Sequence, residues 1–230
     1  MKEVYLAILL SIVIGIMQFW GNRLEIKNKE RSYKIISFSA GITITYIFLE
    51  LLPLVTEVAV SFSNYLFLSV LLGFVIHLFT EREIYKHNHN LKLVRMINLE
   101  ENIFYFMHHI IIGIVFASFM NKDLIHGLLF FLSIMIYSFV SNLPTPTHRP
   151  LRKAIFLASS TFCGSIIGVF LLEIVHIADW VQFAFIGITT GILFFTVTRH
   201  QIPFERRGKL RYFSLGAFIY TLLIMVSWSI

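Results

Sequence analysis

The chain has 230 residues, of which 57% are hydrophobic and only 14% are charged, and its mean hydropathy is +0.78. A soluble domain is about a quarter charged, so the composition excludes a soluble globular protein and predicts a single all-α membrane domain over residues 1–230. The net charge of +6 does not indicate a nucleic-acid partner, because the basic residues fall in the connections between apolar runs.

Eight apolar runs approach the length of about 20 residues that a helix needs to cross a bilayer. They are predicted at 4–20, 34–55, 61–80, 103–120, 124–143, 152–174, 179–198 and 211–229. The first run lacks a sizeable basic segment before it and a small-residue cleavage pattern, so it is predicted to be a spanning helix and not a cleaved signal. Several connections are very short, which favours antiparallel hairpins between neighbouring spans.

The basic residues predict the orientation of these spans. Of the 19 lysines and arginines, all but Lys2 and Lys122 lie at the connections after the first, third, fifth and seventh spans. The positive-inside rule places those connections in the cytoplasm and both termini outside, as in a multi-pass protein of the plasma membrane. The outer side is acidic, which either attracts cations or reflects short polar loops; its titratable residues are Glu57, Asp123, Glu173, Asp179, His126 and His176.

The longest predicted connection is a cytoplasmic loop at 81–102, which contains His87 and His89. Neutral imidazoles in a His-x-His pattern can bind a divalent transition metal. The alternative interpretation is an ordinary solvated polar loop.

Two histidines stand inside the apolar run 103–120, where an ionisable side chain is costly. His109 and Gly113 are four residues apart and share a helix face, with His108 beside them. A glycine lets a second helix approach closely, and we expect that helix to be the fifth span, 124–143. The pattern predicts either a buried site at the centre of a bundle or two histidines that hydrogen-bond between helices for structural reasons.

A pattern of three residues recurs in the second and seventh spans. In each, a glycine is followed nine residues later by a titratable residue and three residues after that by a proline. The residues are Gly41, Glu50 and Pro53 in one case and Gly191, His200 and Pro203 in the other. Because these two spans run in opposite directions, the pattern predicts an inverted repeat in a 3+2+3 arrangement, with the first three spans mirrored by the last three. Such repeats are typical of secondary transporters with a site at the midplane.

The segments 37–41 and 50–53 resemble the second helix of the ZIP family of divalent-metal transporters, and 151–154 with 164–168 resemble its sixth helix. Eight spans, external termini and a histidine-bearing loop after the third span fit the same family, so the resemblance covers nearly the whole chain. It implies a transporter without a prosthetic group. Its substrate would be Zn²⁺ or Fe²⁺, passing between the second, fourth, fifth and seventh spans. The absence of Gly-x-Ser-x-Gly and His-Glu-x-x-His motifs argues against an enzyme.

The chain departs from the family pattern at the expected metal site. The fourth helix of the family carries His-Asn-x-x-Asp/Glu-Gly, and here His109 replaces the asparagine and Ile112 the carboxylate. In the fifth helix the expected histidine and both glutamates are absent from 137–141. The candidate metal ligands that remain are His108, His109, Glu50 and His200, and the candidate pore-lining residues are Ser138, Ser141, Asn142 and Gly113.

Imidazole ligands suit zinc, copper, nickel or iron better than magnesium or calcium. Glu50 is the one carboxylate clearly inside a predicted span; it is a ligand, a counter-charge or a proton carrier, or else an interfacial residue that meets solvent. The expected partners are the lipid bilayer, a divalent metal ion and, as a candidate, a second copy of the chain.

Two alternatives to a transporter are considered. Loss of the carboxylates favours a non-transporting structural or regulatory protein that keeps the ZIP-like bundle. A membrane enzyme is suggested only by Glu100 and Glu101 ahead of the histidine pair, and acids at a helix start are explained by the helix dipole.

Overall fold

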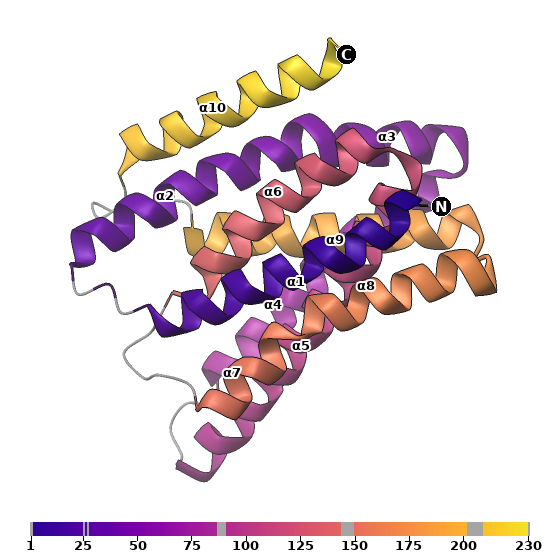
Figure 1. Ribbon diagram of the computed structural model, residues 1–230. Coiled ribbons are helices and arrows are strands. Elements are labelled where there is room, and N and C mark those ends of the chain that lie inside the picture. Colours follow the sequence, from indigo (N-terminus) through magenta and orange to yellow (C-terminus); the bar gives the residue numbers. More distant parts are fainter. Residues whose placement is uncertain are drawn as a thin grey trace.

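The computed structural model describes residues 2–24, 26, 28–86, 91–143, 150–201 and 209–229, and this part of the chain is almost entirely helical, without a strand (Figure 1). The α-helices are α1 (Lys2–Arg23), α2 (Lys29–Tyr46), α3 (Leu52–Ser61), α4 (Phe67–Lys86), α5 (Leu91–Lys122), α6 (Leu124–Ser141), α7 (Leu151–Ala158), α8 (Ser160–Phe170), α9 (Asp179–Thr196) and α10 (Leu210–Trp228). Shorter helical turns are η1 (Ile47–Leu51), η2 (Asn64–Leu66), η3 (Leu171–Val175) and η4 (Val197–Gln201).

Eight helical runs in the described part are long and apolar enough to cross a membrane, as the sequence predicts. They are Glu3–Arg23, Glu30–Ser61, Asn64–Arg82, Asn102–Lys122, Leu124–Ser141, Leu151–Val175, Asp179–Arg199 and Leu210–Trp228. The predicted loop 81–102 differs, because α4 continues to Lys86 and α5 begins at Leu91. Leu, Lys, Arg and Glu in this segment are good helix formers, so the helices extend past their apolar parts. His87 and His89 lie outside the described residues.

The helices α2 and α10 run parallel, side by side, and approach each other at two glycines (Figure 1). Gly41 lies against the backbone oxygen of Phe213 and the backbone nitrogen of Ala217, and Gly216 lies against the backbone oxygen of Phe38. A Cβ at either glycine would collide with backbone atoms, which cannot rotate away. The close contact therefore requires glycine at both positions.

The helices α4 and α9 form a second parallel pair with the same set of contacts. Gly191 lies against the backbone oxygen of Val70 and the backbone nitrogen of Phe74, and Gly73 lies against the backbone oxygen of Ile188. On α4, Gly191 thus contacts the backbone oxygen of one residue and the backbone nitrogen of the residue four positions later. Gly41 makes the same two contacts on α10. Two distant helix pairs are joined through equivalent atoms.

Gly113 in α5 packs against α8, where its nearest neighbours are the backbone oxygen of Thr161, the backbone nitrogen of Ser165 and the backbone of Gly164. The prediction that Gly113 is the packing point for the fifth span was therefore wrong, since α8 belongs to the sixth. The physical reason is that Gly164 in α8 faces the backbone of Ile110 in α5, so two glycines in register let these two helices come closest.

Three spans contain a π-helical turn, an irregularity that is frequent at functional sites. The turn η1 includes Glu50 and the turn η4 includes His200, and each begins six residues after the glycine of its span. In η1 the N–H of Leu52 donates to the oxygen of Ile47. Pro53 follows directly and has no N–H to donate, so an α-helix would lose one backbone hydrogen bond at this position. The wider π-helical turn lies where this bond would be lost.

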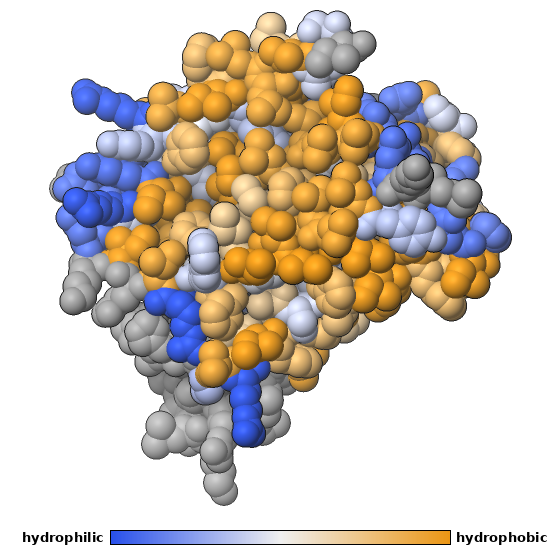
Figure 2. All heavy atoms as spheres, in the orientation of Figure 1, coloured by the Kyte–Doolittle hydropathy of each residue, from blue (hydrophilic) through white to orange (hydrophobic). Residues whose placement is uncertain are grey.

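The core lies between α2, α5, α6 and α10, around aromatic side chains. Tyr46 packs against Phe130, with ring centroids 5.9 Å apart, and against Tyr220 at 6.2 Å. The Tyr220 hydroxyl donates to the backbone oxygen of Leu129 at 2.5 Å, so its polar end is satisfied. On the outside, hydrophobic side chains cover the middle of the face in Figure 2 and hydrophilic ones gather toward its edges. This surface is consistent with contact with a lipid bilayer.

Candidate functional site

His108 in α5 is buried, with only 5% of its surface exposed. Neither Nδ1 nor Nε2 of its ring has a hydrogen-bond partner among the described residues. Leaving a buried polar group unsatisfied costs about 1 to 3 kcal/mol, and such a group in a native structure is often explained by an ion or a functional role. His108 is therefore the centre of the candidate site.

Three other ring systems surround His108. The imidazole of His77, from α4, has its centroid 6.3 Å away, that of His109 lies 5.1 Å away, and the Tyr137 ring of α6 lies 6.4 Å away. His77 Nε2 lies 3.2 Å from Thr196 Oγ1 on α9. Side chains from four spans thus meet at one place.

His109 is buried and is oriented by the preceding turn of α5. Its Nδ1 lies 3.0 Å from the backbone oxygen of Tyr105, and its ring stacks on the Tyr105 ring at 4.1 Å. A carbonyl oxygen only accepts, so Nδ1 carries the proton and donates, which leaves Nε2 with the lone pair. This is the tautomer in which Nε2 can bind a cation.

A polar network lies next to the histidines. Asn142 follows α6, is 5% exposed, and its side-chain amide donates to the Tyr105 hydroxyl and to the Ser138 backbone oxygen, the latter at 2.7 Å. Asn22 of α1 donates to the Asn142 side-chain oxygen at 3.5 Å. Ser138 is fully buried, whereas Ser141 is exposed and its hydroxyl points back to the Ser138 oxygen. Of the three predicted pore-lining residues of α6, the structure places Ser138 and Asn142 inside the bundle and Ser141 at its surface.

Glu50 is buried away from the histidine pair, in a different set of contacts. Its Oε1 accepts a hydrogen bond from Trp228 Nε1 at 3.2 Å, and its Oε2 lies 3.5 Å from His126 Nε2. His126 Nδ1 in turn contacts a carboxylate oxygen of Asp123, which is 43% exposed. Among the described residues, Glu50 forms no group with His108 and His109 that could hold a metal ion, so the structure does not bring these three predicted ligands together. The side chain of His200 lies outside the described residues.

The described residues contain no group of three or more His, Cys, Asp and Glu side chains that could hold a metal ion. Ile112, at the position where the predicted resemblance would place a carboxylate, is fully buried in the hydrophobic core. The imidazoles therefore offer neutral nitrogen ligands without a neighbouring anion.

His77 was not among the predicted site residues. Its signal was available, because an ionisable residue inside a predicted span is a candidate functional residue by default. The site was predicted in α5 because two histidines and a glycine occur together there, whereas His77 is a single histidine in its span. Its proximity to His108 depends on how α4 packs, which sequence spacing does not give.

Asp123, between the fourth and fifth spans, caps α6 by accepting from the N–H groups of Ile125 and His126, both at 3.3 Å. Partial burial raises the pKa of this carboxyl, but the hydrogen bonds from the His126 side chain and from the two backbone N–H groups outweigh it and hold the pKa below its ordinary value. We expect Asp123→Ala to reduce the free energy of unfolding by about 1 kcal/mol at neutral pH, measured by thermal unfolding in detergent.

The sign of the pH dependence follows from the lowered pKa. The stabilisation is present above the pKa of an unfolded aspartate and is lost as the pH falls through the folded value. The charge-dependent part is measured against Asp123→Asn, which keeps a capping oxygen without the charge: wild type should be more stable than Asp123→Asn at neutral pH, and this difference should disappear in acid. A difference that persisted in acid would contradict this account.

No protein-family model matches this sequence, and no curated protein matches it either. The class of protein therefore comes from the structure itself. Eight apolar helices of spanning length define an all-helical, multi-pass membrane protein.

Proposed function

We propose that this chain is a membrane transporter with a ZIP-like architecture that moves a divalent transition-metal cation of the zinc or iron class. The observation that carries the proposal is His108, a buried imidazole with two unpartnered ring nitrogens inside a candidate span. Ionisable residues at such depth mark substrate paths in membrane proteins. Imidazole nitrogen favours zinc and iron over magnesium and calcium.

An inverted repeat in a 3+2+3 arrangement is part of the proposal. Its support is that the second span packs on the eighth through the same backbone atoms by which the seventh packs on the third, around Gly41 and Gly191. The π-helical turns η1 and η4 begin at the same distance from these glycines. A pseudo-twofold axis that exchanges the first three spans with the last three accounts for both features. Because Gly113 meets Thr161 and Ser165 of α8 through the same kind of backbone atoms, the stronger support is the equal spacing from Gly41 and Gly191 to the π-helical turns.

The proposed path runs between the second, fourth, fifth and seventh spans, with the third span added because of His77. From one end, His77, His108 and His109 present imidazoles to the bundle interior. Toward the other end, the chain of contacts from Asp123 through His126 to Glu50 leads from an exposed carboxylate to a buried one. Glu50 would act there as a counter-charge for an arriving cation, on the side that the positive-inside rule assigns to the exterior.

A second candidate function is a non-transporting membrane protein with the same bundle. The observations that favour it are the absence of a three-ligand metal group among the described side chains and the burial of Ile112 at the position of the family carboxylate. Under either function we propose a plasma-membrane location with both termini outside, and a second copy of the chain as a candidate partner.

The test is uptake of Zn²⁺ and Fe²⁺ into liposomes that contain the purified full-length protein. We expect uptake above that of protein-free liposomes, with little uptake of Mg²⁺ or Ca²⁺. Circular dichroism of the same preparation reports whether the protein is folded. Folded protein that gives no more uptake than empty liposomes would contradict transport and favour the second candidate.

A further inference from the structure

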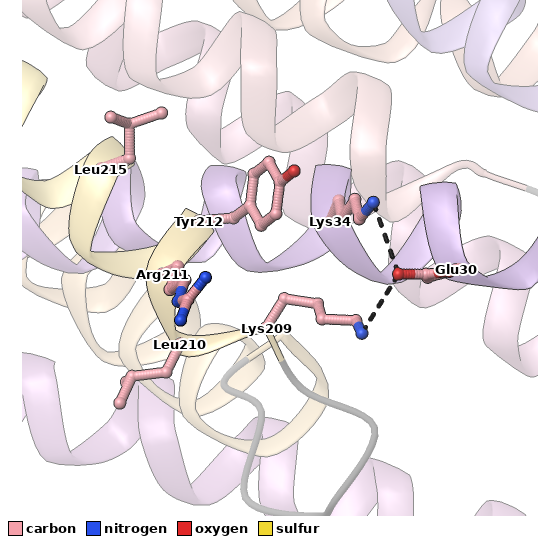
Figure 3. Close-up of a pocket in the computed structure, with 7 residues that line it drawn as sticks. All are labelled: Glu30, Lys34, Lys209, Leu210, Arg211, Tyr212 and Leu215. Carbon is pink, nitrogen blue, oxygen red and sulfur yellow. Dashed lines mark ion pairs between the residues drawn. The ribbon is translucent and has the colours of Figure 1, made fainter.

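A pocket of about 640 Å³ opens between the first turns of α2 and α10 (Figure 3). Three basic side chains, one acidic one and three with apolar or aromatic surface line it; they are Lys34, Lys209, Arg211, Glu30, Leu210, Leu215 and Tyr212. Glu30 and Leu210 are also the first residues of two candidate spans. The pocket therefore lies at the depth where two spans enter the bilayer, on the side that carries most of the basic residues.

The charges in the pocket do not cancel. Lys34 and Lys209 both reach the same oxygen of Glu30, at 3.4 and 3.3 Å, as the dashed lines in Figure 3 show. Arg211 is exposed and makes no ion pair or hydrogen bond through its side chain with the described residues. Three cations against one carboxylate leave the pocket with an excess of two positive charges.

Further contacts hold the Lys34 side chain and the Lys209 backbone. The ammonium of Lys34 lies 5.6 Å from the centroid of the Tyr212 ring, a cation–π distance. The backbone N–H of Lys209 donates to the hydroxyl of Ser37 at 3.2 Å. The positive groups therefore converge from two helices on one space instead of extending separately into solvent.

The rest of the pocket wall is apolar and faces outward. Leu210 is 71% exposed and Leu215 is 50% exposed. An exposed leucine at the start of a spanning helix lies where lipid acyl chains begin. The pocket thus combines a cationic part for a phosphate with an adjoining apolar part for a hydrocarbon chain.

We propose that this pocket binds the headgroup of an anionic phospholipid of the cytoplasmic leaflet. The phosphate lies among Lys34, Lys209 and Arg211, and an acyl chain lies along Leu210 and Leu215. The excess of positive charge selects an anionic headgroup over a zwitterionic one, whose own cation would meet the lysines. The site does not depend on metal transport, since it lies at the end of α2 and α10 and shares no residue with the histidine cluster.

The experiment measures binding of phosphatidylglycerol and of phosphatidylcholine with the same acyl chains to the purified full-length protein, by native mass spectrometry in detergent. Wild type should prefer phosphatidylglycerol. The double substitution Lys34→Gln/Arg211→Gln should weaken phosphatidylglycerol binding about 25-fold, at about 5-fold for each cation removed. Binding that stayed within twofold of wild type would overturn the proposal.

Two further variants make the test specific. Arg23→Gln/Arg152→Gln removes the same charge from exposed positions on α1 and α7 and should leave the phosphatidylglycerol preference unchanged; an equal loss would mean general attraction by basic residues and overturn the site. Glu30→Gln leaves three cations without a carboxylate and should tighten binding several-fold, and a loss of binding would contradict the charge argument.

Free phosphate has the same anionic chemistry as the lipid headgroup. A competition experiment therefore tests whether the pocket binds a lipid or free phosphate. Glycerol 3-phosphate and inorganic phosphate, each at the concentration of the lipid, should not displace phosphatidylglycerol, because they lack the acyl chains that contact Leu210 and Leu215. Displacement at equal concentration would overturn the assignment to a lipid. Leu210→Ser/Leu215→Ser should weaken lipid binding while leaving the charges in place.

Discussion

Replacing His108 by alanine is expected to reduce zinc or iron uptake into protein-containing liposomes by about 10- to 100-fold. The reason is that His108 is the one fully described imidazole of the cluster whose two ring nitrogens both lack a partner and are therefore available to a cation. Removing it breaks no hydrogen bond but leaves a cavity among the rings of His77, His109 and Tyr137, so the melting temperature of each variant is measured together with its uptake. Loss of uptake with an unchanged melting temperature would separate a role in transport from a role in structure.

A matched control is available in His176, which is exposed after η3 and has a positive φ of 52°. His176→Asn removes an imidazole, and asparagine tolerates that backbone conformation, so uptake should stay at the wild-type rate. His77→Ala should give an intermediate loss, since His77 already contacts Thr196. If His108→Ala transported as fast as His176→Asn, the histidine cluster would not be on the path.

Gly191→Ala and Gly41→Ala should each lower the free energy of unfolding by about 1 to 3 kcal/mol, the range for overpacking in a well-packed interior. The added methyl group would collide with backbone atoms of the partner helix, in α4 for Gly191 and in α10 for Gly41. Backbone atoms move only if the whole helix moves. Thermal unfolding followed by circular dichroism in detergent measures the loss.

The control for the glycine variants is Ser214→Ala in α10, a small substitution at an exposed position. It should change the free energy of unfolding by less than about 0.5 kcal/mol. If the proposed inverted repeat is correct, the losses at Gly41 and Gly191 should be similar, because both glycines meet the same kind of atoms. A large loss at one glycine and none at the other would contradict equivalence of the two helix pairs.

Hydropathy predicted the eight spans because length and apolar content are properties of a local segment, and the bilayer allows few alternatives to a helix. The burial of His108 and His109 was predicted for the same reason, since both lie inside an apolar run. The sequence also predicted that Gly41 and Gly191 occupy corresponding positions in their spans, because each lies at the same distance from a titratable residue and a proline.

Contacts between spans could not be predicted in this way. Glu50 pairs with Trp228 and His126, which come from spans far away in the chain, and nothing local to Glu50 indicates either partner. Gly113 meets α8 instead of α6 because Gly164 happens to lie opposite it. Which faces of eight apolar helices meet is decided by small differences in packing that are spread over many residues.

The helices α2 and α10 are in contact at three levels along their length. Glu30 binds Lys209 at one end, Gly41 and Gly216 are in close contact near the middle, and Glu50 binds Trp228 at the other end. Twenty residues of helix separate Glu30 from Glu50, which is about 30 Å at 1.5 Å per residue, the thickness of a bilayer core. Contacts at three points oppose both sliding and rotation of α2 against α10, so the two helices move together as one rigid unit. A movement of α2 that shifts Glu50 on one side of the membrane therefore carries the basic pocket on the other side with it.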